Sequence, residues 1–200
     1  MKVKEISHRK LYPRTSSVSN TPGIYAWYYD YRKLIDILNS TASRDIVIDT
    51  FLNELESISK KIKLPTVKGN IKGKLNTEYT CIIDNVDYLK SKSYHSKMTL
   101  TDFDMLKESI YVLQSYSAPL YIGKAVSQSL RDRYKQHIKN YDDAASGKTD
   151  KNTFGYRLYE VGLNPSELIF KYHSLTNRNN EIDMIEHIIN RITKPTLGER

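Results

Sequence analysis

The sequence predicts an α+β fold in which a small central β-sheet is flanked by helices and interrupted by a mostly helical insertion. Three short segments, 23–29, 118–123 and 167–174, are rich in β-branched and aromatic residues, a composition typical of strands. Between them, apolar residues recur at helical spacing. The expected order is therefore strand, insertion, strand, helix, helix, strand and helix.

The chain's 200 residues are enough for one domain with a core of ordinary size. Residues 1–21 carry Pro13 and a polar run with little periodicity, so we expect an N-terminal arm there. Residues 22–200 are expected to form a single domain, with the insertion at about 30–117.

The insertion has two regions with a helical pattern. Apolar residues repeat at helical spacing over 34–38 and 51–58, ahead of Pro65, and predict two helices or one broken helix. The segment 66–84 contains glycines and a Tyr-Thr-Cys-Ile-Ile run, which indicates an extended segment or a hairpin. Another apolar stripe predicts a helix over 102–115.

The C-terminal third alternates between the two kinds of element. After the strand at 118–123, Ser129 and Asp132 have the spacing of a helix start, and a stripe of apolar residues follows. That stripe consists of Leu130, Tyr134, Ile138 and Tyr141. We expect the remaining elements to be a loop at 142–152, a short helix at 153–162, the strand at 167–174 and a helix at 180–192.

The net charge and the single cysteine limit which partners and which metal sites are expected. The 31 Lys and Arg against 23 Asp and Glu give a net charge of +8, which favours a polyanionic partner, with nucleic acid first. No apolar run approaches the ~20 residues of a membrane span, and no signal peptide is recognisable, so we expect a cytoplasmic protein without membrane contact. Because Cys81 is the only cysteine, a disulfide framework and a thiolate-rich zinc site are excluded.

Two triplets then point to a family. Residues 23–25 read Gly-Ile-Tyr and residues 121–123 read Tyr-Ile-Gly, and these resemble the paired motifs of the GIY-YIG nuclease family. Arg133 and His137 follow the second triplet at a spacing similar to the family's strand-to-helix segment. Glu186, with a proline nine residues later, resembles the family's acidic helix and tail. The resemblance covers about 22–29 and 118–198.

The chain departs from the family pattern in two places. In most members the triplets lie close together, whereas Tyr25 and Tyr121 are separated by almost half of this chain. Because 23–29 independently has the pattern of a strand, we interpret the separation as an insertion, as in the restriction-endonuclease-like branch. The family usually has Asn three residues after the tail proline, where this chain has Gly198, which lacks an amide side chain.

Phosphodiester hydrolysis needs an activated water, stabilisation of negative charge on phosphate oxygens, and capture of the leaving oxygen. The planar guanidinium of arginine suits phosphate geometry. A phenol can act as a base near neutral pH only if a nearby cation or a metal-bound water favours the proton transfer. Mg²⁺ is commonly held by a single carboxylate together with water and phosphate oxygens.

The resemblance implies Tyr25 as base or water-orienting group, Tyr121 as its partner, and Glu186 as ligand of Mg²⁺ or Mn²⁺. Lys124, directly after the second triplet, is placed to supply the nearby cation. Arg133 suits the phosphate charge, and His137, four residues later, lies beside it on one edge of the helix.

These roles imply a divalent-metal-dependent endonuclease acting on double-stranded DNA. Restriction or defence is the preferred biological role, and mobile-element and repair nucleases remain alternatives. We expect four basic side chains to contact the DNA: Lys124, Arg131, Arg133 and Lys135. The alternative is a catalytically inactive nucleic-acid-binding protein that retains the fold; RNA cleavage has only the positive charge in its favour. Cutting both strands with one site per chain would favour a two-fold dimer.

Overall fold

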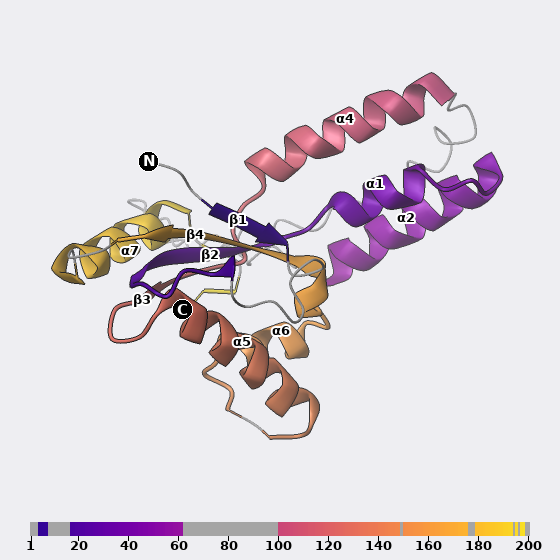
Figure 1. The fold of residues 1–200 in the computed structure, drawn as a ribbon. Coiled ribbons are helices and arrows are strands. Elements are labelled where there is room, and N and C mark those ends of the chain that lie inside the picture. The colour runs from indigo at the N-terminus through magenta and orange to yellow at the C-terminus, as the bar shows by residue number, and fades with distance from the viewer. Residues whose placement is uncertain are drawn as a thin grey trace, which may run out of the picture.

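The fold is α+β, as the sequence predicts, with a small antiparallel sheet and helices on both of its faces (Figure 1). The structure, a computed structural model, describes residues 4–7, 17–61, 100–148, 150–175 and 179–193, with Pro195, Leu197 and Gly198. The strands are β1 (Lys4–Ser7), β2 (Gly23–Tyr29), β3 (Tyr121–Ala125) and β4 (Leu168–Ser174). The helices are α1 (Arg32–Leu38), α2 (Arg44–Lys61), α4 (Leu100–Tyr116), α5 (Leu130–Ala145), α6 (Phe154–Glu160) and α7 (Asn179–Thr193), with a 3₁₀ turn at Pro165–Glu167.

The sheet has the strand order β1-β4-β2-β3, and every neighbouring pair is antiparallel. The two strands that carry the triplets lie side by side, since Tyr25 of β2 pairs with Gly123 of β3. On its other side Tyr25 pairs with Tyr172 of β4. β2 is therefore a central strand and β3 an edge strand, and the pairing brings distant parts of the chain together.

Alternation along the strands divides the sheet into two faces. In β2 the residues Gly23, Tyr25, Trp27 and Tyr29 are buried, and the residues between them are only half-buried. The face that bears Tyr25 and Trp27 is covered by α5 and α6, which lie below the sheet in Figure 1. Helix α7 covers the opposite face, where its Ile182 is fully buried.

The insertion forms a helical unit that extends from one end of the sheet (Figure 1). Helix α1 packs against both α2 and α4 through buried residues such as Leu34 and Ile35. The Gln114 amide of α4 accepts from the backbone N–H of Tyr31 at 2.8 Å and donates to the carbonyl of Tyr29 at 2.9 Å. These two bonds tie the end of the insertion to its beginning. The predicted hairpin at 66–84 lies outside the described residues.

Two expectations about the fold are wrong. Residues 1–21 are not only an arm, because β1 pairs with the edge of β4 and Val18 is completely buried. The partner of β1 is far away in the sequence, so a four-residue strand left no local pattern to detect. Helix α5 continues to Ala145, into the loop expected at 142–152. The sequence pattern missed this turn because Asp142 and Asp143 interrupt the apolar stripe.

Within the part of the chain that the structure describes, no helix is both long and apolar enough to cross a membrane. Helix α2 combines an apolar stripe with a charged face, whereas α4 also exposes large apolar side chains such as Met105, Val112 and Leu113. The two faces of α2 suit packing against a core on one side and contact with water on the other.

We predict that Val18→Ala lowers the free energy of unfolding by about 1–3 kcal/mol, because it removes two methyl groups from a fully buried site. Val112→Ala, the same change at a side chain that is 56% exposed on α4, should cost much less. Urea denaturation of both variants measures the difference. Equal losses would show that the segment around Val18 does not contribute to the core.

Candidate active site

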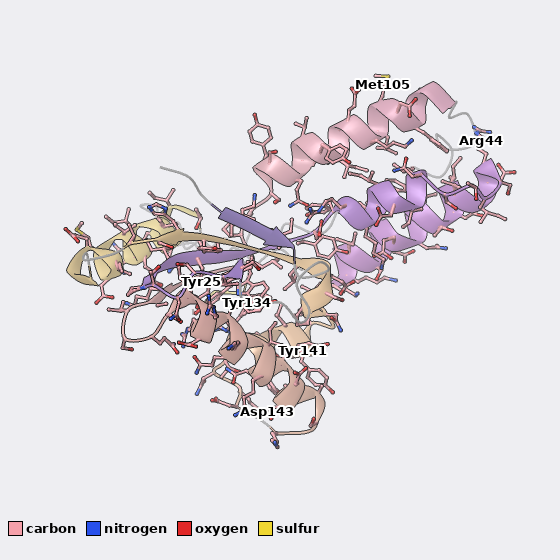
Figure 2. All side chains as sticks on the ribbon, in the orientation of Figure 1. Tyr25, Arg44, Met105, Tyr134, Tyr141 and Asp143 are labelled. Atoms are coloured by element: carbon pink, nitrogen blue, oxygen red, sulfur yellow. The ribbon has the colours of Figure 1, made fainter. Side chains whose placement is uncertain are left out.

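The hydroxyl of Tyr25 is the centre of a buried polar cluster on the α5 face of the sheet. Its side chain points toward α5 and Tyr25 is 1% exposed (Figure 2). The hydroxyl lies 2.7 Å from Nε2 of His137 and accepts a hydrogen bond from Nε of Arg133 at 3.2 Å. A tyrosine from the first triplet therefore contacts the arginine and histidine that follow the second triplet.

Helix α5 places these two side chains through its local sequence. The Ser129 hydroxyl caps the helix by accepting from the backbone N–H of Asp132, as the sequence predicts. Arg133 and His137 are one turn apart, so they point in the same direction from the helix. His137 is 4% exposed, whereas Arg133 is half-buried and also donates to Oε1 of the exposed Gln136 at 2.8 Å.

The second triplet contributes space as well as a side chain. A Cβ atom at Gly123 would collide with the hydroxyl of Tyr25, so only glycine fits opposite it. Two residues earlier, Tyr121 faces the same side, with its ring centroid 6.1 Å from that of Tyr25 and 5.6 Å from that of His137. The structure thus brings Tyr25, Tyr121, Arg133 and His137 together.

Burial favours the neutral forms of Tyr25 and His137. Desolvation raises the pKa of the Tyr25 phenol well above its usual range, and the lowering effect of Arg133 does not offset it. Desolvation, with the nearby Arg133 and Arg157 charges, lowers the pKa of His137 to about 3. A phenolate at neutral pH is therefore disfavoured, which favours the water-orienting role for Tyr25 over the role of base.

These contacts fix Arg133 as a donor to Tyr25, whereas the direction of the Tyr25–His137 bond depends on the imidazole tautomer. Since Arg133 donates to the phenol oxygen, the Tyr25 proton can be donated to the neutral His137 at Nε2. His137 then carries its own proton on Nδ1, which is buried and has no hydrogen-bond partner. With the Tyr25 O–H donating to His137, a water could donate to the remaining lone pair of the hydroxyl oxygen or replace one of its two partners.

Lys124 and Glu186 lie on the other face of the sheet, so the structure does not place Glu186 in one cleft with Tyr25, Tyr121 and Arg133. Gly123 faces α5, and the next residue in the strand, Lys124, faces α7. Its Nζ lies 3.0 Å from Oδ1 of Asp183 and 3.5 Å from Oε2 of Glu186. The cation beside Tyr25 is Arg133 and not Lys124.

Glu186 has the chemistry expected of a Mg²⁺ ligand, with carboxylate oxygens in a half-exposed position. Its Oε1 accepts from the Asn190 amide, and its Oε2 shares Lys124 with Asp183, one turn earlier on α7. The hydrogen bond to Asp183, with help from Glu186, raises the pKa of Lys124. Among the described residues no group of three or more His, Cys, Asp or Glu side chains is arranged to hold a metal.

The remaining predicted DNA contacts have different surroundings. Arg131 donates from Nε to the carbonyl of Val18 at 3.0 Å, which gives it a role in holding the N-terminal segment. Lys135 is exposed on α5. In the tail, the backbone N–H of Leu197 donates to the carbonyl of Leu120 at 2.7 Å, so the tail contacts the start of β3 through backbone atoms. The side chain missing from Gly198 is not needed for that contact.

Two charged residues near the site were not found from the sequence. Asp183 shares Lys124 with Glu186, and its position three residues earlier on the same helix was the available indication. Arg157 of α6 stands over the ring of Tyr121, with its Cζ 5.6 Å from the centroid. No motif marked Arg157; a basic residue one position before the buried Leu158 is an ordinary helical pattern.

The pKa of His137 predicts a pH dependence of stability. The unfolded chain takes up a proton near the ordinary pKa of about 6.5, whereas the folded chain does so only near 3. The contribution is therefore complete above pH 6.5 and is lost as pH falls toward 3. Relative to a His137→Gln variant, which does not titrate, the protein should lose roughly 2 kcal/mol of unfolding free energy between pH 7 and pH 5. Urea titrations that run parallel over this range would contradict the assignment.

Comparisons with known proteins do not add to this geometry, since no family model, curated protein or solved structure matches the chain. The interpretation of the site therefore depends on its own residues. These are the phenol, imidazole and guanidinium groups on the α5 face, and the lysine and carboxylate groups on the α7 face.

Proposed function

We propose that this chain is a divalent-metal-dependent endonuclease that hydrolyses phosphodiester bonds of double-stranded DNA. The observation that carries the proposal is the buried Tyr25 hydroxyl, bound by both His137 and Arg133, on a strand paired with the second triplet. A phenol, a neutral imidazole and a guanidinium can orient a water and stabilise the charge of a phosphate. The net charge of +8 supports a polyanionic substrate.

Arg133 can exchange its hydrogen bond to Gln136 for one to a substrate phosphate. One of its N–H groups is used inside the cluster, on Tyr25, and another donates to Gln136, which is exposed. A phosphate oxygen can replace the neutral amide oxygen of Gln136 and make a stronger, charge-assisted bond. Rotation of the guanidinium in that exchange would free the Tyr25 hydroxyl for a water.

The edge strand β3 is where the residues on the α5 face and those on the α7 face can both reach one substrate. Tyr121 faces α5 and Lys124 faces α7, and β3 has no further strand beyond it in the described sheet. A phosphodiester lying along this edge would be approached by Arg133 from one face and by Glu186 from the other. A bound Mg²⁺ would supply a Lewis acid for the leaving oxygen, with Glu186 and Asp183 as the available carboxylates.

A second candidate is a catalytically inactive nucleic-acid-binding protein with the same fold. The observation in its favour is that Glu186 forms an ion pair with Lys124 on the opposite face from Tyr25. That pairing would have to open before the carboxylate could serve a metal. Restriction or defence is the first choice of role for an active enzyme, and two copies would be needed if one site per chain cuts both strands.

A plasmid assay with Mg²⁺ or Mn²⁺ tests the proposal, and Tyr25→Phe is its sharpest variant. The wild-type protein should nick or linearise the plasmid, and loss of the hydroxyl should lower the rate by at least ~10²-fold while DNA affinity is kept. Tyr172→Phe is the matched control, because Tyr172 is the buried neighbour of Tyr25 and donates only to the carbonyl of Ser17. A wild-type protein that binds DNA without cleaving it would favour the second candidate.

Glu186→Gln should abolish cleavage at every Mg²⁺ concentration while leaving DNA binding intact or slightly stronger, because a negative charge near phosphate is removed. Binding is measured by mobility shift in Ca²⁺ and cleavage in Mg²⁺. Glu181→Gln is the control, since Glu181 is an exposed acid in the first turn of the same helix. Persisting cleavage in Glu186→Gln would remove this residue from the site.

A further inference from the structure

The α5 and α6 face of the sheet carries two guanidinium groups without a carboxylate partner. Arg133 binds the Tyr25 hydroxyl and the Gln136 amide oxygen, which are both uncharged. Nε of Arg157 is buried and has no hydrogen-bond partner. Within the described ranges, no ion pair joins either arginine to an acidic side chain.

Tyr121 brings these two positive charges to one place. Arg157 stands over the face of its ring at 5.6 Å. Arg133 binds the hydroxyl of Tyr25, whose ring centroid lies 6.1 Å from that of Tyr121. Phe154, at the start of α6, stacks on the same ring with a centroid distance of 4.6 Å and so fixes α6 against β3. Both arginines also act on His137, which lies 5.6 Å from the Tyr121 ring.

Positive charges held partly out of water are unfavourable unless an anion or a set of hydrogen bonds compensates them. The neighbours on this face cannot do so, because Tyr25 and His137 are neutral and Nδ1 of His137 is itself buried without a partner. A group with negative charge and several acceptor oxygens would satisfy both guanidinium groups at once.

We propose that Arg133 and Arg157 together bind one phosphate group of the DNA backbone, which makes Arg157 a second phosphate-contacting residue of the site. The inference rests on the proposed function for its substrate. It adds a helix, α6, to the elements that recognise DNA. It also explains why an arginine is placed over the ring of Tyr121 rather than on the exposed side of α6.

The first test uses the wild-type protein and inorganic phosphate, followed by NMR of the arginine Nε–H groups. The signals of Arg133 and Arg157 should shift together with a single dissociation constant. The signal of Arg44, which lies at the far end of the helical insertion in Figure 2, should not follow them. Independent shifts, no shifts, or an equal shift of Arg44 would overturn the proposal.

Variants then separate charge from geometry. Arg157→Gln should weaken phosphate binding by about tenfold or more, and Arg157→Lys should restore part of it because the charge returns without the planar fork. With duplex DNA in Ca²⁺, the slope of log affinity against log salt should fall by about 1 for Arg157→Gln. Arg44→Gln removes the same charge and should change neither result. Phosphate affinity that is unaltered in Arg157→Gln would contradict the inference.

The two proposals fail in different ways. A wild-type protein that binds phosphate through both arginines but never cleaves DNA would contradict the nuclease and keep the phosphate site. Cleavage that is lost in Tyr25→Phe and Glu186→Gln, with Arg157→Gln indistinguishable from wild type in binding and rate, would keep the nuclease and remove Arg157 from it.

Discussion

The fixed position of the Tyr25 side chain is the constraint on which both the sheet and the candidate site depend. The residue lies on the central strand, with β3 on one side and β4 on the other. Its hydroxyl fits only because Gly123 has no side chain, and it is bound by His137 and Arg133 from α5. A change in register of either strand would break these contacts together, so packing and polar bonding specify the same arrangement.

The polar groups of the candidate site are divided by charge as well as by face. On the α5 side, burial leaves a neutral phenol and a neutral imidazole beside positive guanidinium groups. On the α7 side, Lys124 is shared by Asp183 and Glu186, and the negative charges exceed the positive one. An anionic substrate would therefore be attracted to one face and a cation to the other. The edge strand β3 keeps these two environments apart in the free protein.

Much of this arrangement could be predicted because the relevant patterns are local. Aromatic and β-branched runs identified the strands, and Ser129 with its apolar stripe identified α5. The pairing of residues 4–7 could not be predicted, since a short edge strand depends on a distant partner. Strand alternation next to Gly123 would have predicted that Lys124 points to the opposite face of the sheet. The resemblance to the family motif hid this, because it treated the motif residues as one site. Arg157 depends on how α6 packs, which no spacing in the sequence encodes.

The bonds between Gln114 and the first residues of the insertion have a consequence for how the protein folds. Strands β2 and β3 are antiparallel neighbours, and residues 28–120 take the place that a hairpin turn would occupy. A tight turn normally sets the register of such a pair and lets it form from one end. Pairing of these strands instead closes a long loop, which raises contact order and is expected to slow folding. Packing of α1 on α4, with Gln114 bonded to Tyr29 and Tyr31, would shorten that loop and help the two strands to meet.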